Sequence, residues 1–342
     1  MSNIRNIKVA DFFSLNTNEE KIKFLLQYAV LAPSTHNSQP WLFKINEDSC
    51  EIYKNINKEI PIGDKIGRDL FISIGCILEN LIQAALYYNI YKNYIYRINS
   101  KNNLIVEVFF KNLDKSIVNQ NKSYLLNAIQ MRANKRGIFK AKLLPTHVFT
   151  KLKILAKRYP DVKLHLVTKS EDRKQLSDLT AEGMKYAYKN PKFRKEMSEW
   201  FINNYSSKKE GIPGYSINLP DLISIFFPYI VRFFNIGPVV AKLNRISVGS
   251  APLIIVITSK KNNPISWLQV GRLAERIMLE LVNDRIKTSI YVASIEMGKL
   301  YKKVQKILRT KEIPQFLFSA GYIDGPKKFT PRHPVEDKIT LA

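Results

Sequence analysis

Two segments of the chain, 196 positions apart, carry the same helical pattern. In RDLFISIGCILENLIQAALYY, residues 68–88, one helical face has apolar residues at 71, 74, 77, 78, 81, 82, 85 and 86. Adding 196 to each of these numbers gives an apolar residue every time, within WLQVGRLAERIMLELV at 267–282. Stripes of this width are typical of helices with a wide buried face, so both segments are predicted to be central helices.

Two further positions of this repeat also agree. Gly75 corresponds to Gly271, and Glu79 corresponds to Glu275. Any two amphipathic helices share an apolar stripe, whereas a shared glycine and a shared glutamate are more specific evidence of relatedness. The sequence therefore predicts two related halves in one chain. We place the first half at residues 1–120 and the second half at 121–342.

Short apolar runs in both halves are predicted to be strands. They are WLFKI at 41–45, CEIYK at 50–54, LIVEVFF at 104–110, APLIIVIT at 251–258 and FLFSAGY at 316–322. Few of them form strict strand–helix–strand units. The mixture of elements predicts an α+β fold, a mainly antiparallel sheet with central helices packed on it.

The turn APSTHNSQPW, residues 32–41, is unusually rich in hydrogen-bonding groups. Pro33 and Pro40 restrict its backbone, and the residues between them offer both donors and acceptors. Such a turn can meet a flat heteroaromatic ring at its edge. Its side chains can equally well cap their own backbone, and local physics leaves both interpretations open.

Two basic segments could recognise an anion. RANKR at 132–136 places Arg132, Asn134 and Arg136 at spacings of two and four, and arginine suits bidentate binding of phosphate. The alternative is an exposed basic face of a helix. PRHPVED at 331–337 adds Arg332, which by itself indicates a surface tail.

Several common catalytic motifs are absent from the sequence. There is no G-x-G-x-x-G, no P-loop and no G-x-S-x-G motif. The four histidines show no metal-ligand spacing, and no carboxylates are paired at a suggestive distance. We therefore name no catalytic side chain and no metal site.

Taken in order, these segments resemble the nitroreductase superfamily. APSTHNSQPW resembles the flavin-contacting turn of that family, P-S-S-x-N-x-Q-P-W, and MRANKRGIF resembles its R-x-S-x-R-x-F phosphate motif. ASIEMG at 293–298 occupies the place of its P-I-E-G turn, while SAGY and PRHPVED resemble its V-G-Y strand and closing arginine segment. Because the flavin turn and the phosphate motif lie in different halves, the chain is most similar to the fused, two-half Acg-like subgroup.

The resemblance implies a nitroreductase-like pseudo-dimer with one FMN between the halves and one decayed site. It implies hydride transfer from NADH or NADPH, through FMN, to a nitroaromatic or quinone-like small-molecule acceptor. The alternative is a lid-covered, flavin-sequestering stress protein with little NAD(P)H turnover. The cofactor-binding residues that it implies are Pro33, Ser34, Thr35, Asn37, Gln39, Arg132, Asn134, Arg136, Ser294, Ile295, Glu296 and Arg332.

The sequence departs from the family pattern in four respects. Asn134 replaces the usual serine, Met297 replaces a glycine, and Thr330 replaces a basic residue. The fourth is an insertion at about 205–245, which we expect to form a lid over the flavin. Its apolar part, 219–243, contains prolines 220, 228 and 238. It is too broken to span a membrane and too apolar to lie bare in water, and the alternative is an amphipathic element on a membrane surface.

The formal charge of +25 would suit a nucleic acid or an anionic surface. The lysines are spread along the whole chain, and no nucleic-acid-binding motif accompanies them, so we expect neither a nucleic-acid partner nor a membrane contact. The N-terminus lacks the apolar region of a signal peptide, and there are only two cysteines, which favours a cytoplasmic location. We expect a monomeric pseudo-dimer or a homodimer of such chains.

Overall fold

The computed structural model describes residues 4–98, 102–111, 118–325 and 328–340, and it contains two four-stranded sheets built on one plan. The first sheet has the order β1-β2-β4-β3, with β1 at Trp41–Ile45, β2 at Ser49–Lys54, β3 at Tyr91–Tyr96 and β4 at Leu104–Phe110. The second has the order β5-β8-β10-β9, with β5 at Val162–Val167, β8 at Leu253–Ser259, β9 at Lys287–Ile290 and β10 at Ile313–Gly321. All pairings within both sheets are antiparallel.

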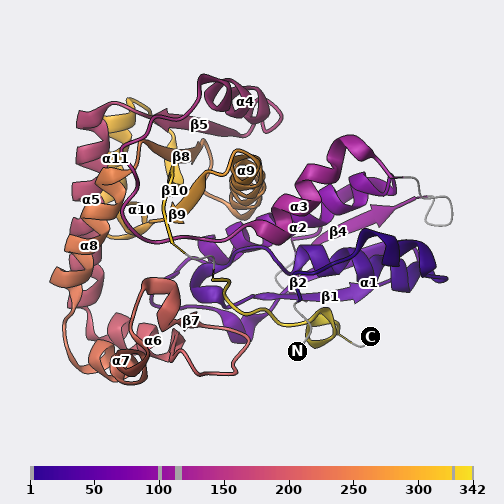
Figure 1. Ribbon diagram of the computed structural model, residues 1–342, viewed down its shortest axis with the longest axis horizontal. Helices are drawn as coiled ribbons and strands as arrows, with labels where there is room; N and C mark the ends of the chain where they lie inside the picture. Colours follow the sequence, from indigo (N-terminus) through magenta and orange to yellow (C-terminus); the bar gives the residue numbers. More distant parts are fainter. Residues whose placement is uncertain (1–3, 99–101, 112–117, 326–327, 341–342) are drawn as a thin grey trace.

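The helices repeat in the same order as the strands. In each half a helix precedes the first strand, and a central helix links the second strand to the third. These are α1 (Asn18–Ala29) and α2 (Arg68–Tyr87) in the first half, and α4 (Thr146–Ala156) and α9 (Pro264–Asn283) in the second. The predicted α+β class with two related halves is confirmed (Figure 1).

Local sequence accounts for the start of α1. The Thr17 hydroxyl accepts a hydrogen bond from the backbone N–H of Glu20, and the Glu20 carboxylate accepts one from the backbone N–H of Thr17. This capping box satisfies donors that the first turn of a helix leaves unpaired. The helix ends at Ala29, because the chain tightens into a turn ahead of Pro33.

The two repeated glycines meet where α2 crosses α9. A Cβ atom on Gly75 would lie 2.2 Å from the carbonyl oxygen of Leu268 and 3.0 Å from the Cα of Gly271. A Cβ on Gly271 would lie 2.0 Å from the carbonyl oxygen of Ile72. The two helix backbones therefore touch, and any side chain at either position would force them apart.

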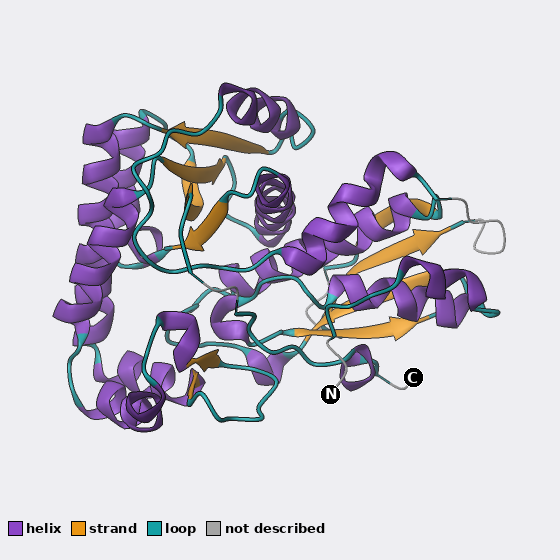
Figure 2. Ribbon diagram, in the orientation of Figure 1, coloured by secondary structure: helices purple, strands orange, loops and turns teal. Residues whose placement is uncertain are grey.

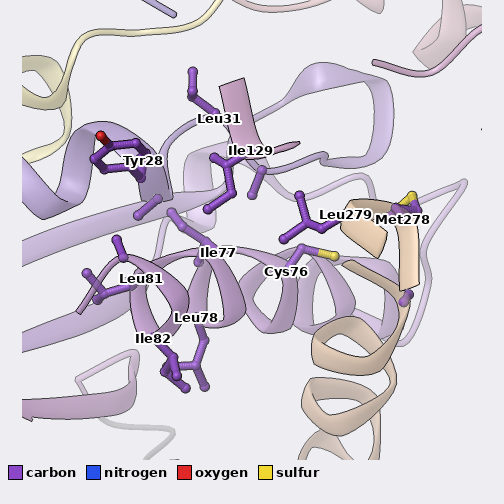
Figure 3. Close-up of a cluster of buried hydrophobic side chains, with 14 of the residues drawn as sticks. Tyr28, Leu31, Cys76, Ile77, Leu78, Leu81, Ile82, Ile129, Met278 and Leu279 are labelled. Carbon is purple, nitrogen blue, oxygen red and sulfur yellow. The ribbon is translucent and has the colours of Figure 1, made fainter. Parts of the chain in front are cut away.

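The two halves share one continuous core around this crossing. Figure 3 shows Ile77 and Leu81 of α2 beside Tyr28 of α1 and Ile129 of α3 (Ser123–Met131), with Met278 of α9 nearby. Buried residues of both sheets belong to the same cluster. The halves are therefore packed together as one folding unit.

A helical insertion distinguishes the second half from the first (Figure 2). It lies between β5 and β8 and comprises α5 (Ser170–Lys189), α6 (Pro191–Trp200), β6 (Phe201–Ile202), β7 (Ile212–Pro213), α7 (Asp221–Phe233) and α8 (Gly237–Ser250). Helix α5 packs against α8, and α6 packs against α7. Two short helices, α10 (Ala293–Glu296) and α11 (Leu300–Leu308), lie between β9 and β10.

The expectation that the apolar part of this insertion buries its large side chains is wrong. Helix α7 runs for 13 residues with Pro228 inside it, and its buried residues are Ser224 and Val231. Large side chains such as Phe226 and Phe233 are 62% and 67% exposed. The helix packs on its neighbours through Ser224, Val231 and Phe227, whose ring meets that of Phe201 edge-on, and most of its other large apolar side chains are exposed.

Candidate functional site

The turn between α1 and β1 has a strained backbone. His36, Asn37 and Gln39 have φ angles of 54°, 59° and 51°, which is the left-handed region that residues other than glycine rarely adopt. Such conformations persist when the surrounding structure holds them, and they are concentrated at functional sites. Here the Ser34 hydroxyl accepts a hydrogen bond from the Gln39 backbone at 2.9 Å, which closes the turn on itself.

Gln39 joins the turn to two distant segments. Its side-chain amide donates to the carbonyl of Lys209 at 2.7 Å, and its side-chain oxygen accepts from the backbone of His333 at 2.9 Å. The Lys338 ammonium donates to the Gln39 carbonyl at 2.9 Å. Because both polar ends of this buried side chain are used within the protein, Gln39 supports the turn and is not placed to contact a ligand.

The C-terminal tail crosses from the second half to the first. Thr340 donates its backbone N–H to the carbonyl of Phe43 on β1 at 2.8 Å, and Ile339 pairs with Phe43 as a parallel bridge (Figure 1). This path carries Arg332 to the turn. Its guanidinium donates to the Asn37 side-chain oxygen and to the carbonyl of Ala32, 3.2 Å away.

Arg332 lies in a buried group of cations. Arg132 is 3.1 Å from the Glu275 carboxylate and donates to the carbonyl of Leu31 at 2.9 Å, and Arg5 donates to the carbonyl of Arg132 at 3.1 Å. Arg332 also donates to the Thr330 hydroxyl at 2.7 Å and to the carbonyl of Pro331 at 2.9 Å, so its acceptors are all neutral. Among the described residues it has no carboxylate partner, and its Nε atom is buried without an acceptor. Burial and the positive charges of Arg5 and Arg132 hold the pKa of Arg332 well below its usual range.

The buried positive charge of Arg332 lacks an anion to compensate it within the part of the chain that the structure describes. Burying a cation is costly unless an anion or several acceptors compensate it. A phosphate carries nearly two negative charges at neutral pH and offers acceptors suited to guanidinium donors. The donor set around Arg332 and Arg132 therefore fits a bound phosphate group.

A second charged cluster lies on the other side of the turn. Arg68, the first residue of α2, is 3.4 Å from both the Asp69 and the Glu296 carboxylates. The Thr35 hydroxyl donates to Asp69 at 3.3 Å. Burial, followed by the negative charge of Asp69, raises the pKa of Asp64 to about 7 and raises the pKa of Glu296 well above its usual range. At neutral pH this cluster therefore retains a proton beside the turn.

The segment 132–136 is not the basic helix face that its spacing suggested. Helix α3 ends at Met131, and Arg132 already has extended backbone angles. Asn134 pairs with Thr288 of β9 as a parallel bridge and is exposed. The guanidinium carbon of Arg136 lies 5.3 Å from the ring centre of Tyr291, so this extended segment runs beside β9 and the residue that follows it.

The remaining predicted residues belong to α10. Ser294 and Ile295 are buried, and the Ser294 hydroxyl has no hydrogen-bond partner among the described atoms. Glu296 ends this helix and belongs to the cluster with Arg68. The structure thus brings the turn, the tail, the 132–136 segment and α10 into one region between the halves.

Sequence reasoning missed three charged residues of this region, Arg5, Arg68 and Asp69. The last two had a recognisable signal, because they form a charged pair at the start of an otherwise apolar helix. Arg5 had none, since its position beside Arg132 depends on a contact between residues 127 positions apart.

The polar part of the insertion lies against the turn and the tail. The Trp200 ring centre is 6.2 Å from that of His36, and the Tyr215 hydroxyl donates to the carbonyl of Phe329 at 3.0 Å. The Asn218 side chain donates to the carbonyl of Arg136 at 3.4 Å. Residues 200–218 therefore cover part of this region, and the C-terminal end of α8 contacts residues 137–139 and Tyr291 beside it.

Comparisons with known proteins give short or distant similarities. No family model matches the chain. A curated relative from two strains of Mycobacterium tuberculosis, provisionally named as an NAD(P)H nitroreductase, is 34% identical over 65 residues. That match spans 19% of this chain and 19% of the relative.

Two solved structures are similar over most of their own length. The FMN-dependent nitroreductase NfnB from Mycobacterium smegmatis, in complex with NADPH, aligns over 65% of this chain and 100% of its own, with 14% identity and a TM-score of 0.43. A nitroreductase with bound FMN from Desulfitobacterium hafniense DCB-2 aligns over 64% of this chain and 98% of its own, with 17% identity and a TM-score of 0.40.

Proposed function

We propose that this chain is an FMN-binding oxidoreductase of nitroreductase type. The observation that carries the proposal is the buried Arg332, which lacks an anionic partner among the described residues and lies beside a strained, hydrogen-bonding turn. The order of the motifs in the sequence and the short similarity to a curated NAD(P)H nitroreductase support it.

The residues around the turn have distinct parts in this proposal. Arg132, Arg136 and Arg332 hold the phosphate of FMN, with Asn134 at the ribityl end. Pro33, Ser34, Thr35 and Asn37 meet the edge of the ring system, and residues 294–296 lie beside its reactive side. The chemistry that bound FMN supplies is a two-electron exchange, in which NADH or NADPH loses a hydride and a nitroaromatic or quinone-like acceptor gains it with a proton.

The chain's own groups prepare the site for this exchange. The left-handed backbone of the turn is held by hydrogen bonds within the protein, which orient its donors and acceptors. The Glu296 carboxyl group, whose pKa is raised by burial and by the neighbouring Asp69, holds a proton close to the carboxylate that Thr35 contacts. Trp200 and the 200–218 segment limit the entry of water from one side.

We further propose that each chain holds one FMN, because only one flavin turn exists. The connection between α1 and β1 spans residues 30–40, whereas the corresponding connection between α4 and β5 spans only 157–161. The shorter connection, KRYPD, contains no counterpart of the P-S-T-x-N sequence. The second site of the pseudo-dimer has therefore lost its turn.

The absorption spectrum of the purified protein tests this proposal directly. We expect a bound flavin that is released on denaturation and identified as FMN by chromatography. Anaerobic mixing with NADH or NADPH should bleach the yellow colour, and a nitroaromatic or quinone should restore it. A protein that neither retains nor takes up FMN at micromolar concentrations would overturn the proposal.

The second candidate function is flavin sequestration with little turnover. It is favoured by the contacts of residues 200–218, which tie the insertion to both the turn and the tail. In that case the flavin is bound tightly, but NADH and NADPH bleach it slowly or not at all. Dithionite should still bleach it, which separates a shielded flavin from an absent one.

A further inference from the structure

We infer that α7 and α8 form a docking surface for an anionic lipid bilayer. This inference is independent of the proposed flavin chemistry. It begins with seven side chains that are each 61–72% exposed and that we call the apolar stripe. They are Leu222, Phe226, Tyr229, Phe233, Phe234, Val239 and Leu243.

The apolar stripe follows the helical period. On α7, residues 222, 226, 229 and 233 are spaced by four, three and four, and on α8 residues 239 and 243 are spaced by four. Residues at these spacings lie on one face of a helix. The face that α7 turns inward carries Ser224, Phe227 and Val231, while more of its large apolar side chains are exposed than buried, unlike the usual surface helix of a globular protein.

The geometry of the pair suits a bilayer surface better than its interior. The two helices together are apolar enough to cross a membrane, but they are bent by 115° at the break between them. Helix α7, with 13 residues, is about 20 Å long, which is less than the roughly 30 Å of a hydrocarbon core. Helices of this kind lie in the interface with their apolar face among the headgroups and upper acyl chains.

The charges of the segment select the partner. Residues 219–250 contain one acidic residue, Asp221, and three exposed basic residues, Arg232, Lys242 and Arg245. Arg245 pairs with Asp178 of α5, so Arg232 and Lys242 supply most of the positive charge of this segment. Asp221 accepts a hydrogen bond from Asn204. A second copy of the chain would bring the same excess of positive charge to the interface, whereas anionic headgroups would neutralise it.

The position of the pair in the molecule leaves it accessible. Figure 1 shows α7 at the lower left corner and α8 along the left edge beside α5, away from the first sheet. Exposed Lys185 and Lys189 of α5 add positive charge next to α8. The apolar stripe could therefore enter a bilayer surface without any rearrangement of the two sheets.

Vesicle sedimentation tests the inference. At 150 mM salt we expect the full chain to bind vesicles of phosphatidylcholine with 30% phosphatidylglycerol at least tenfold more tightly than vesicles of phosphatidylcholine alone. The triple change Phe226→Ser, Phe233→Ser and Leu243→Ser should weaken binding to the mixed vesicles at least tenfold. The matched change Phe13→Ser, Leu143→Ser and Ile154→Ser, at exposed apolar positions elsewhere, should leave it unaltered.

A fluorescence measurement keeps the inference testable if the triple variant folds poorly. In Tyr229→Trp, we expect a blue shift of the new tryptophan emission on mixed vesicles, measured against the native protein. No binding, no blue shift, or equal loss in both triple variants would overturn the inference. A concentration-dependent dimer that the first triple change abolishes, without vesicle binding, would overturn it in favour of a second copy of the chain.

Discussion

Arg136 offers the most direct single-residue test of the phosphate end. We expect Arg136→Ala to weaken FMN binding about ten- to a hundredfold, because a charge-assisted hydrogen bond contributes roughly 1.5–3 kcal/mol. Riboflavin lacks the phosphate, so its affinity should hardly change. Quenching of flavin fluorescence on titration into the apoprotein measures both affinities.

The control for this change is Arg97→Ala, which removes an arginine paired with Glu107 at the first sheet. It should leave both affinities as they are. Equal weakening of FMN and riboflavin by Arg136→Ala would mean that Arg136 supports the fold, through its contact with the Tyr291 ring, and does not bind phosphate.

Asp64 makes the stability of the protein depend on pH. Burial and the neighbouring Asp69 raise its pKa in the folded state from 3.8 to about 7. A carboxyl group with a raised folded pKa contributes stability that is complete below its ordinary pKa and is lost as the pH rises through about 7. The free energy of unfolding should therefore lose about 1–2 kcal/mol from this group between pH 4.5 and 7.5, after allowance for its partial exposure.

Asp64→Asn should remove that loss, since the amide cannot ionise but can still accept the hydrogen bond from the Leu70 backbone. Urea unfolding of both proteins at pH 4.5 and 7.5 provides the comparison. Asp324→Asn, at a side chain 80% exposed, is the matched control and should lose as much free energy of unfolding between the two pH values as the native protein does. If Asp64→Asn also lost as much as the native protein, the carboxyl group of Asp64 would not be the source of the pH dependence.

Among the elements, the crossing of α2 and α9 is the contact most sensitive to one added methyl group. In Gly75→Ala the new Cβ would lie 2.2 Å from a backbone oxygen of α9, so the helices must separate. We expect a loss of about 1–3 kcal/mol or more, which exceeds the 0.5–1 kcal/mol that alanine gains over glycine in a helix. Gly271→Ala should behave in the same way, because its contact is the mirror of the first.

Gly249→Ala is the control for this effect. A Cβ on Gly249 of α8 would lie 3.4 Å from the Ser177 hydroxyl, which is an ordinary contact. We expect this change to leave the midpoint of urea unfolding unaltered or to raise it slightly. If Gly75→Ala matched Gly249→Ala, the close approach of the two central helices would be wrong.

For the molecule as a whole, the arrangement of the turn and the tail predicts that one chain completes one flavin site. The turn, the 132–136 segment and Arg332 come from both halves of the same chain and are joined by hydrogen bonds. Light scattering combined with flavin quantitation should therefore give about one FMN per chain, whatever the oligomeric state. Two FMN per chain would contradict the decayed second site, and flavin bound only by dimers would contradict the pseudo-dimer.

Short-range patterns were sufficient for the repeated architecture. Each helical stripe and the Thr17 capping box depend on residues close together in the chain, where periodicity and capping chemistry act directly. Comparing the two stripes, with Gly75 matched to Gly271, then revealed the repeat. The motifs likewise identified the turn, the 132–136 segment and Arg332 as parts of one region. The sequence did not show that 132–136 is extended, because its spacing fits a helix face as well as a strand.

Contacts between distant parts of the chain decided the backbone of the turn and the direction of the apolar stripe. The left-handed backbone at His36, Asn37 and Gln39 is held by the tail and the insertion, which are distant in sequence and leave no local signature. The outward direction of the apolar stripe follows from how α6 and α5 pack against α7 and α8. Composition reveals that a segment is apolar, but whether its apolar face meets protein or solvent depends on the neighbours that the folded chain places beside it.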